Sequence, residues 1–389
     1  MAQREESGRV LRRRRLVIAL AVALLVAAGV AVGTGVTGRS ATTEPTDVTV
    51  MTRNLYLGGD ITRPVRAAQG QTGVAALLAL GHAADALRTV VDQTDFPSRA
   101  RLLAAELAES RPDLAGLQEV ALWRHGPLQL DQPGRLDATE VDLDFLALLL
   151  GELDTRGLPY DVVATQDESD VEAPAFRGDP RTGNDPTARD VRLTMRDVVL
   201  VRRGSGIEVT GTGTGQYAHR IDVDLGGVAF SFIRGYAWAD VRVGGSALRF
   251  VTTQLESQSP AVAEAQAQEL LAGPLAVTGR PVVLGCDCNS GPTEASDDGR
   301  AAYGLLVGSG LADAWVAQPD GQGTGATCCL GERVDAEAPD LDRRIDLVLS
   351  RGAITDRAEL VGSTPAGRDP ASGLWAADHA GLVAHLRLG

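Results

Sequence analysis

The chain has 389 residues, of which 44% are hydrophobic and 23% are charged. These proportions exclude an intrinsically disordered chain, and the length suits one large domain or two ordinary ones. A formal net charge of −14 argues against binding to polyanions through a basic face, unless a metal ion or a local arginine cluster intervenes.

The N-terminal segment combines basic residues with a long apolar run. Residues 12–15 are all arginine, and residues 16–36 carry no charge over a length that could span a bilayer. Positive charge on the N-terminal side keeps that end in the cytoplasm. Residues 1–37 are therefore predicted to be a signal peptide or an uncleaved membrane anchor, with a buried core helix as the alternative. After a linker at 38–46, the chain is expected to be extracellular, either secreted or anchored to the outer face of the cell membrane.

Two predicted strands in the first third of the chain end in polar residues. A β-rich run at 47–57 predicts a strand with Asn54 near its end, and the apolar run at 114–120 predicts a buried strand that ends in Glu119. The spacing of apolar residues predicts helices over 64–110, about 140–155 and 261–276. The last helix of the first segment is predicted at 98–110, with Ser98 as its N-cap. Residues 166–190 are rich in Asp, Pro, Arg and Gly and predict a long loop.

Later strands again carry polar side chains in or beside them. The predicted strands are 160–166, 197–204, 228–243, 247–257, 281–285, 343–352 and 379–388. The polar residues are Gln254, Asp287, Asn289, Asp346, Asp378 and His379. This alternation of strands and helices predicts an α/β fold in which two packed mixed β-sheets are flanked by helices, within one catalytic domain over 47–389.

Cysteine alternates with polar residues in the segment 286–289. Because successive strand side chains point to opposite faces, Asp287 and Asn289 are predicted to share one face and the two cysteines the other. The remaining cysteines are adjacent, at 328 and 329. In an exported protein we predict disulfides that join the two segments, with a zinc site as the alternative.

Carboxylates and amides at strand ends describe a site for a hard metal ion. Mg²⁺ binds through one or two carboxylates together with waters and substrate phosphate oxygens, and Mn²⁺ or Ca²⁺ are the alternatives. An Asp-His pair near a phosphate suggests a hydrogen-bonded imidazolium that faces developing negative charge. Any one of these residues alone carries little weight, because a single strand Asp is more often a cap or turn residue.

The order of these motifs resembles that of the endonuclease/exonuclease/phosphatase superfamily, which includes deoxyribonuclease I, AP endonucleases and bacterial sphingomyelinases. The matching segments are MTRNLYL (first strand with its Asn), LAGLQEV (metal-binding Gln-Glu), VVLGCDCNS (Gly-Asp-x-Asn), RRIDLVL (Arg-Ile-Asp) and AADHAGLVAHLRL (terminal Ser-Asp-His). The resemblance covers about residues 47–389. It implies the four-layer deoxyribonuclease I-like sandwich.

The resemblance also implies which residues bind the divalent ion, expected to be Mg²⁺. Glu119 is expected to be the metal ligand, with Asn54 beside it. Asp378 is expected to complete the metal or phosphate shell.

For the chemical step, the resemblance implies four further roles. Asp287 orients or deprotonates the attacking water, and Asn289 holds the phosphate or the nucleophile. His379 contacts the phosphoryl oxygens. Asp346 keeps His379 cationic, because a neighbouring carboxylate raises the pKa of an imidazole.

Gln254 departs from the family pattern, because the strand that usually ends Thr-His-Leu here reads VTTQLES. Glutamine can donate a hydrogen bond to a phosphate oxygen but cannot be cationic or transfer a proton. The leading interpretation is an exported, metal-dependent phosphoesterase that hydrolyses a phosphodiester or phosphomonoester by water attack. The alternative is a catalytically weak or inactive relative that binds a phosphate ligand outside the cell. A structural cell-surface domain would leave the strand-end residues unexplained.

The sequence leaves the substrate open among nucleic acids, phospholipid headgroups and sugar phosphates. Candidate phosphate contacts in a nuclease, which could equally be solvated surface arginines, are Arg177, Arg181, Arg202, Arg203 and Arg234. Aromatic residues make up only 4% of the chain, which argues against an aromatic wedge that enters a membrane. An uncleaved N-terminal segment would still hold the chain at the membrane, and we expect a monomer.

Overall fold

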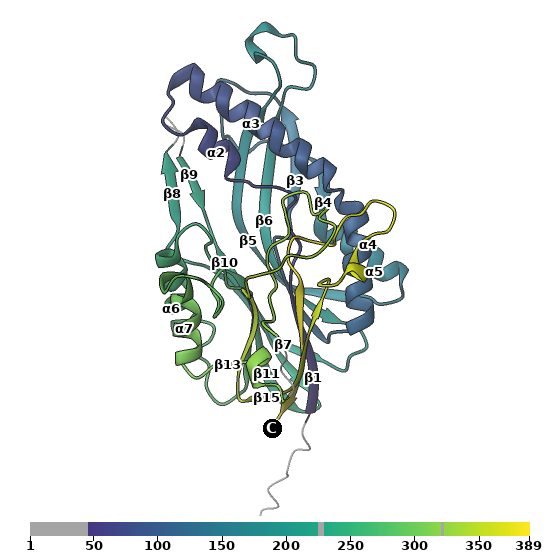
Figure 1. The fold of residues 1–389 in the computed structure, drawn as a ribbon. Coiled ribbons are helices and arrows are strands. Elements are labelled where there is room, and N and C mark those ends of the chain that lie inside the picture. Colours follow the sequence, from purple (N-terminus) through teal and green to yellow (C-terminus); the bar gives the residue numbers. More distant parts are fainter. Residues whose placement is uncertain (1–45, 225–228, 320–322) are drawn as a thin grey trace, which may run out of the picture. The chain divides into compact units, whose positions relative to one another are not determined.

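The computed structural model describes residues 46–224, 229–319 and 323–389. The predicted export segment and all but the last residue of the predicted linker lie outside the described residues. Within them, two β-sheets pack against each other and helices lie on their outer sides (Figure 1).

The larger sheet has eight strands, in the order β15-β16-β1-β2-β6-β3-β4, with β5 paired to β6 outside this path. Its strands are β1 (Thr46–Asn54), β2 (Leu114–Gln118), β3 (Leu122–Pro127), β4 (Glu140–Asp144), β5 (Tyr160–Ala175), β6 (Arg189–Arg202), β15 (Ala353–Val361) and β16 (Gly381–Leu388). β1 and β2 run parallel and the other pairs are antiparallel, so this sheet is mixed, as predicted.

The smaller sheet has six strands, in the order β13-β14-β12-β11-β10-β7. Its strands are β7 (Glu208–Gln216), β10 (Gly235–Val243), β11 (Ser246–Gln254), β12 (Val282–Asp287), β13 (Ala312–Asp313) and β14 (Asp346–Arg351). β11 and β12 are parallel, which makes this sheet mixed as well. A separate two-stranded sheet is formed by β8 (Ile221–Asp224) and β9 (Ala229–Phe232).

Helices complete the predicted four layers. The α-helices are α2 (Arg63–Ala68), α3 (Gly73–Gln93), α4 (Phe96–Ser110), α5 (Phe145–Thr155), α6 (Pro260–Ala272), α7 (Ala301–Gly308) and α8 (Ala314–Ala317), and the 3-10 turns are Pro180–Thr182, Asp298–Arg300 and Pro365–Gly367. Apolar side chains of α3, α4 and α5 pack on the larger sheet, and those of α6 and α7 pack on the smaller one. Side chains such as Val50, Phe250 and Val283 fill the space between the sheets. By length and composition alone α3 could cross a membrane, but here its residues Ala84, Leu87 and Val91 belong to the apolar core on the outer side of the larger sheet.

The long loop predicted over 166–190 is wrong. β5 continues to Ala175 and β6 begins at Arg189, so only residues 176–188 connect them. The polar composition of the segment predicted a loop, but Glu168 and Glu172 are buried in β5 and only 4% and 2% exposed. Backbone N–H groups satisfy part of each carboxylate. A strand can therefore bury acidic residues that a polarity pattern assigns to solvent.

Two predicted helix starts also need correction. The helix expected from about residue 140 begins at Phe145, after β4, and the Asp144 side chain accepts hydrogen bonds from the first amides of α5. The helix expected to begin after Ser98 instead begins at Phe96, with Asp95 in the left-handed region at φ 39°.

The two parallel strand pairs bring the polar strand ends together. In the larger sheet Asn54 pairs with Gln118, so Glu119 follows directly beside the end of β1. In the smaller sheet Asp287 pairs with Gln254 on one side and with Asp346 on the other. The carboxyl ends of parallel strands meet at one edge of a sheet, which is where α/β folds place their ligand sites.

The four cysteines pair within each segment, and the predicted bridges between the segments are wrong. Cys286 is bonded to Cys288, and Cys328 is bonded to Cys329. Ligand atoms of Cys328, Cys329 and His379 lie within 4.8 Å of one another, so the zinc alternative stays a prediction. Cys286 and Cys288 lie in the apolar core under α6 and α7, on the far side of β12 from Asp287.

Candidate active site

Asp287 lies at the centre of the group of polar residues at the strand ends, and it is only 1% exposed. Its Oδ2 accepts hydrogen bonds from Asn54 Nδ2 and Gln254 Nε2, both at 3.0 Å, and its Oδ1 accepts from the backbone N–H of Asn289 at 3.1 Å. Burial raises the pKa of Asp287, while the charge of His379 acts in the opposite direction. Three donors and one nearby cation thus hold a basic carboxylate in a fixed orientation.

His379 and Asp346 form a buried dyad beside Asp287. The Nδ1 of His379 lies 2.8 Å from Asp346 Oδ2, and one oxygen or nitrogen from each of the three residues lies within 4.8 Å of the others. Burial alone would lower the pKa of His379, but the carboxylates of Asp346 and Asp378 outweigh it and raise that pKa well above its ordinary value. The neighbouring carboxylates therefore favour the imidazolium form of the ring.

Glu119 and Asp378 line one cavity of about 250 Å³. Glu119 has a left-handed φ of 55°, which turns the chain directly after β2, and its Oε2 accepts from the backbone N–H of Leu57 at 3.0 Å. Burial raises the pKa of Asp378 to about 7, with the His379 charge opposing this and the Glu119 charge adding to it. Asp378 Oδ1 is buried and has no hydrogen-bond partner among the described residues. An orphaned carboxylate oxygen that faces a second carboxylate is suited to a divalent cation.

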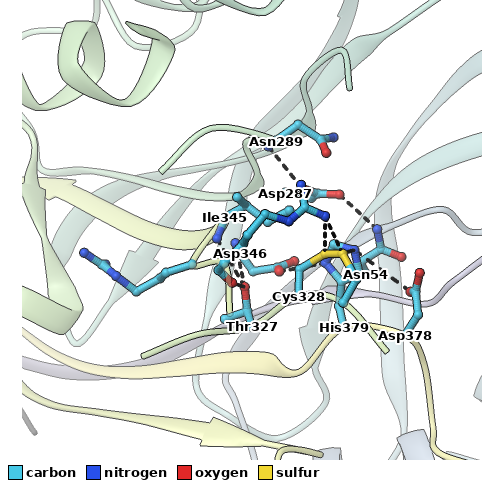
Figure 2. The surroundings of a disulfide bond; sticks show 12 residues. Asn54, Asp287, Asn289, Thr327, Cys328, Ile345, Asp346, Asp378 and His379 are labelled. Atoms are coloured by element: carbon cyan, nitrogen blue, oxygen red, sulfur yellow. Dashed lines mark hydrogen bonds and ion pairs between the residues drawn. A yellow bond between two sulfur atoms is a disulfide. The ribbon is translucent and has the colours of Figure 1, made fainter. Parts of the chain in front are cut away.

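Asn54 links the two groups of residues. Its Nδ2 donates to Asp287, and its Oδ1 accepts from the backbone N–H of Tyr56 at 2.7 Å. Figure 2 shows Asn54, Asp287, Asp346, Asp378 and His379 gathered beside the Cys328–Cys329 disulfide, with the side chain of Asn289 at the margin of the group.

Asn289 does not share a strand face with Asp287, contrary to the i, i+2 prediction. β12 ends at Asp287, and Asn289 has a left-handed φ of 44°. Its Nδ2 donates to the backbone oxygen of Leu255 at 2.9 Å. Strand alternation fails here because the chain has already turned, although the backbone N–H of Asn289 still binds Asp287.

Gln254 bridges the metal-side and catalytic-side carboxylates. Its Nε2 donates to Glu119 Oε1 at 2.7 Å and to Asp287 Oδ2 at 3.0 Å, and its Oε1 accepts from Arg234 Nη1. Both N–H bonds of the amide are thus directed at carboxylates, so Gln254 acts in this structure as a positioning residue. Its role as a phosphate donor stays a prediction.

Arg234 stands out from the five arginines considered as phosphate contacts. Its side chain is only 7% exposed and lines the cavity, where it also faces Glu168 and Glu256. The other four arginines do not line this cavity. Each forms an ion pair with an aspartate: Arg177 with Asp85, Arg181 with Asp179, Arg202 with Asp113 and Arg203 with Asp161. From the sequence, Arg234 carried no more weight than the other four arginines. The signal that could have singled it out is its position just after the apolar segment that contains β9.

We expect Gln254→Ala to lower kcat/KM about 10- to 100-fold, because it removes hydrogen bonds to charged groups worth roughly 1.5–3 kcal/mol. Gln254→Glu, which has the same shape, should be at least as damaging, since it sets a third carboxylate against Glu119 and Asp287. Gln258→Ala, in the same cavity wall, serves as a mutagenesis control. Steady-state kinetics of the three variants would contradict the positioning role if Gln254→Glu matched the wild type.

Two buried arginines hold the backbone around the site. Arg53 forms a two-fold ion pair with Glu106 and also donates to the backbone oxygens of Asn54 and His379.

Arg99 is the second of these arginines. It donates to the backbone oxygens of Leu55, Tyr56, Thr94 and Ala376, and burial lowers its pKa to about 10. The end of β1 and the segment before Asp378 are thereby tied together.

Replacement of Arg53 should destabilise the whole fold. Arg53→Met leaves the Glu106 carboxylate buried without its partner, which costs roughly 3–5 kcal/mol of unfolding free energy. The double variant Arg53→Met/Glu106→Leu should recover part of this loss, because no unpaired charge remains. Urea unfolding curves measure both, and equal losses in the single and double variants would show that the ion pair is not responsible.

The comparisons with known proteins agree with this geometry. The model of the Endonuclease/Exonuclease/phosphatase family matches residues 91–379. An endonuclease/exonuclease/phosphatase family protein from Bacteroides thetaiotaomicron has a similar fold, with a TM-score of 0.54 and 13% identity over 89% of this chain and 99% of its own. A mannosyl-6-phosphatase from the same species has a TM-score of 0.51 and 14% identity over 87% of this chain and 99% of its own. The comparison with curated proteins gave no match. The chain therefore belongs to the endonuclease/exonuclease/phosphatase family, whose members are generally phosphoesterases.

Proposed function

We propose that the chain is an exported, divalent-metal-dependent phosphoesterase that hydrolyses its substrate by attack of water. The observation that carries the proposal is the convergence of Asp287, Asp346 and His379, with ligand atoms within 4.8 Å of one another, beside the cavity that holds Glu119 and Asp378. A binding protein would need a donor set for phosphate, but it would not need a buried base opposed to an imidazolium.

The donor set fits a hard divalent cation, for which Mg²⁺ is the first choice and Mn²⁺ or Ca²⁺ are alternatives. Glu119 and Asp378 would hold it, with the amide oxygen of Asn54 close by, because these groups are oxygen donors and Asp378 Oδ1 accepts no hydrogen bond from the described residues, although His379 Nε2 lies 4.0 Å from it. When bound, such an ion neutralises charge on the phosphoryl oxygens and favours the ionised form of a nearby water.

The remaining residues act on the water and on the phosphate. Asp287 accepts the proton of the attacking water, in the orientation fixed by Asn54 and Gln254. His379 donates from Nε2 to a phosphoryl oxygen and stabilises the negative charge that builds up there, while Asp346 holds the ring through Nδ1. Asn289 keeps the loop after Asp287 in place through Leu255 and contacts the phosphate or the nucleophile when substrate binds.

The dependence of activity on pH should reflect the protonation of His379 in its dyad with Asp346. His379 acts in its cationic form, so activity falls as pH rises through its raised pKa. Asp346→Asn keeps an acceptor for Nδ1–H but removes the charge that raises this pKa. The descending limb of the kcat/KM profile should therefore move to lower pH, while the ascending limb, set by Asp287, changes less. An unmoved descending limb would show that His379 does not control it.

Small phosphate esters are the substrates that the cavity favours. Besides Glu119 and Asp378, its wall contains three acidic residues, Asp60, Glu256 and Glu332, and Arg234 is its only basic lining residue. Asp60, Glu256 and Glu332 pair with Arg66, Arg234 and Arg63, so among the described residues the lining leaves little free positive charge for a polyanionic nucleic acid, whereas a sugar phosphate or a phospholipid headgroup brings a single phosphate. The mannosyl-6-phosphatase shares the fold, and on that ground mannose 6-phosphate belongs among the compounds to be tested.

A substrate panel tests this proposal. Mannose 6-phosphate, a phosphorylcholine diester, single-stranded DNA and RNA are compared at equal phosphate concentration with Mg²⁺, Mn²⁺ or Ca²⁺. We expect the small esters to be hydrolysed fastest. Tight binding of a phosphate ester without turnover under every condition would instead favour the catalytically inactive alternative.

Export rests on the sequence of residues 1–37 alone. We propose that these residues direct the catalytic domain out of the cytoplasm, either released or anchored to the membrane, and that it acts as a monomer. Fractionation of cells followed by N-terminal sequencing decides between release and anchoring, and recovery only from the cytoplasm would contradict export.

A further inference from the structure

A second carboxylate cluster lies in the larger sheet and shares no residue with the catalytic cavity. It consists of Asp137, Glu172 and Asp190, and one carboxylate oxygen of each lies within 4.8 Å of one from each of the others. Glu172 is on β5 and Asp190 on β6, where the antiparallel register opposes Asp190 to Pro174. Asp137 comes from residues 128–139, the loop that joins β3 and β4.

Glu172 and Asp190 are buried, Asp137 is partly exposed, and the two buried carboxylates are only half satisfied. Glu172 Oε2 accepts from the backbone N–H groups of Asp137 and Ala138, both at 3.0 Å, and Asp190 Oδ2 accepts from that of Gln129 at 3.0 Å. The second oxygens, Glu172 Oε1 and Asp190 Oδ1, are buried and have no hydrogen-bond partner among the described residues. Buried carboxylate oxygens in folded proteins are nearly always paired, so two unpaired oxygens within one cluster call for a partner.

The arginines close to the cluster are either exposed or paired with another carboxylate. Within the described part of the chain, Asp137 forms a 3.3 Å ion pair with Arg135, whose side chain is 58% exposed. The nearby Arg192 is bound through two nitrogens to Asp170. Burial raises the pKa of Glu172, and raises that of Asp190 to about 7, as expected for carboxylates gathered without a cation.

We propose that the second carboxylate cluster binds a calcium ion, which fastens the loop 128–139 to β5 and β6. Three carboxylates from a loop and two strands form an oxygen-only ligand set, which suits a hard cation and not zinc, whose sites use His or Cys. Calcium tolerates the irregular geometry of such a set, whereas Mg²⁺ requires a near-octahedral shell and keeps several waters. The ion would supply the missing partner of Glu172 Oε1 and Asp190 Oδ1.

Titration of the full chain with CaCl₂ after removal of metal by EDTA tests the proposal. Glu119→Gln serves as the background, so that binding at the catalytic cavity is weakened, and the cluster variants below separate what remains of it from binding at the second carboxylate cluster. We expect the melting temperature to rise by about 5 °C at a hundred-fold excess over the dissociation constant. Hydrogen exchange of the amides in 128–139 should slow at the same time, because Gln129, Asp137 and Ala138 donate to the ligand carboxylates.

Both responses should be lost when Glu172→Gln or Asp190→Asn is added to the background, and both should persist with Asp131→Asn, an exposed carboxylate of the same loop. The neutral variants also relieve repulsion in the metal-free protein, so they are expected to fold, and either one suffices. A calcium response that survives Glu172→Gln and Asp190→Asn would overturn the proposal. So would the absence of any response in the background protein, or an equal response to MgCl₂ alone.

Discussion

Asp287→Asn should lower kcat about 10³-fold, within the range expected for the loss of a general base. The carboxylate of Asp287 is the group that accepts the proton of the attacking water, and an amide cannot take its place. The amide also presents an N–H group to Asn54 Nδ2 or Gln254 Nε2, so the orientation of the centre suffers as well. Single-turnover kinetics with a small phosphate ester measure the chemical step directly.

The fold should survive this change, because Asp287 is a buried carboxylate with a raised pKa, and its replacement by a neutral group removes a charge from the core. Thermal unfolding therefore serves as the control, together with Asp298→Asn, an exposed carboxylate that follows the same motif. Wild-type turnover in Asp287→Asn would remove Asp287 from the chemical step.

Glu119→Gln should lower kcat/KM about 10²- to 10³-fold at limiting Mg²⁺, because it removes one of the two carboxylates that hold the ion. The amide keeps the shape of the side chain, and its oxygen can still accept from Leu57. Part of the loss should be regained at high Mg²⁺, which distinguishes weakened metal binding from damage to the chemical step.

Activity measured against Mg²⁺ concentration, with metal binding followed by calorimetry, checks this prediction. Glu109→Gln, on the exposed face of α4, provides the matched control. An unchanged metal dependence in Glu119→Gln would place the ion elsewhere.

The sequence predicted the framework of the site because its strands are apolar runs that end abruptly in polar residues. β2 and β12 are buried along their whole length, and Glu119 and Asp287 follow or end them as expected. The buried faces of such strands determine where the chain must lie in the sheet. Polar residues at the strand ends are therefore the easiest part of a site to find from sequence.

The errors arise where tertiary contacts overrule local polarity. The Asp, Pro, Arg and Gly content of 166–190 suggested a loop, but Arg234 and backbone N–H groups allow β5 to bury Glu168 and Glu172. Asn289 lies beyond a left-handed turn that alternation could not reveal. Gln254 looked like the loss of a histidine, whereas its contacts with Arg234 and two carboxylates depend on strands distant in sequence.

Hydrolysis by the metal-stripped full chain, before and after addition of Mg²⁺, tests the proposed mechanism most directly. Wild-type protein and Asp287→Asn are compared on the best substrate of the panel, with phosphate or alcohol release as the readout. The mechanism predicts that Mg²⁺ restores turnover in the wild type and not in Asp287→Asn. Turnover that is unaffected by removal of metal, or that Asp287→Asn retains, would contradict it.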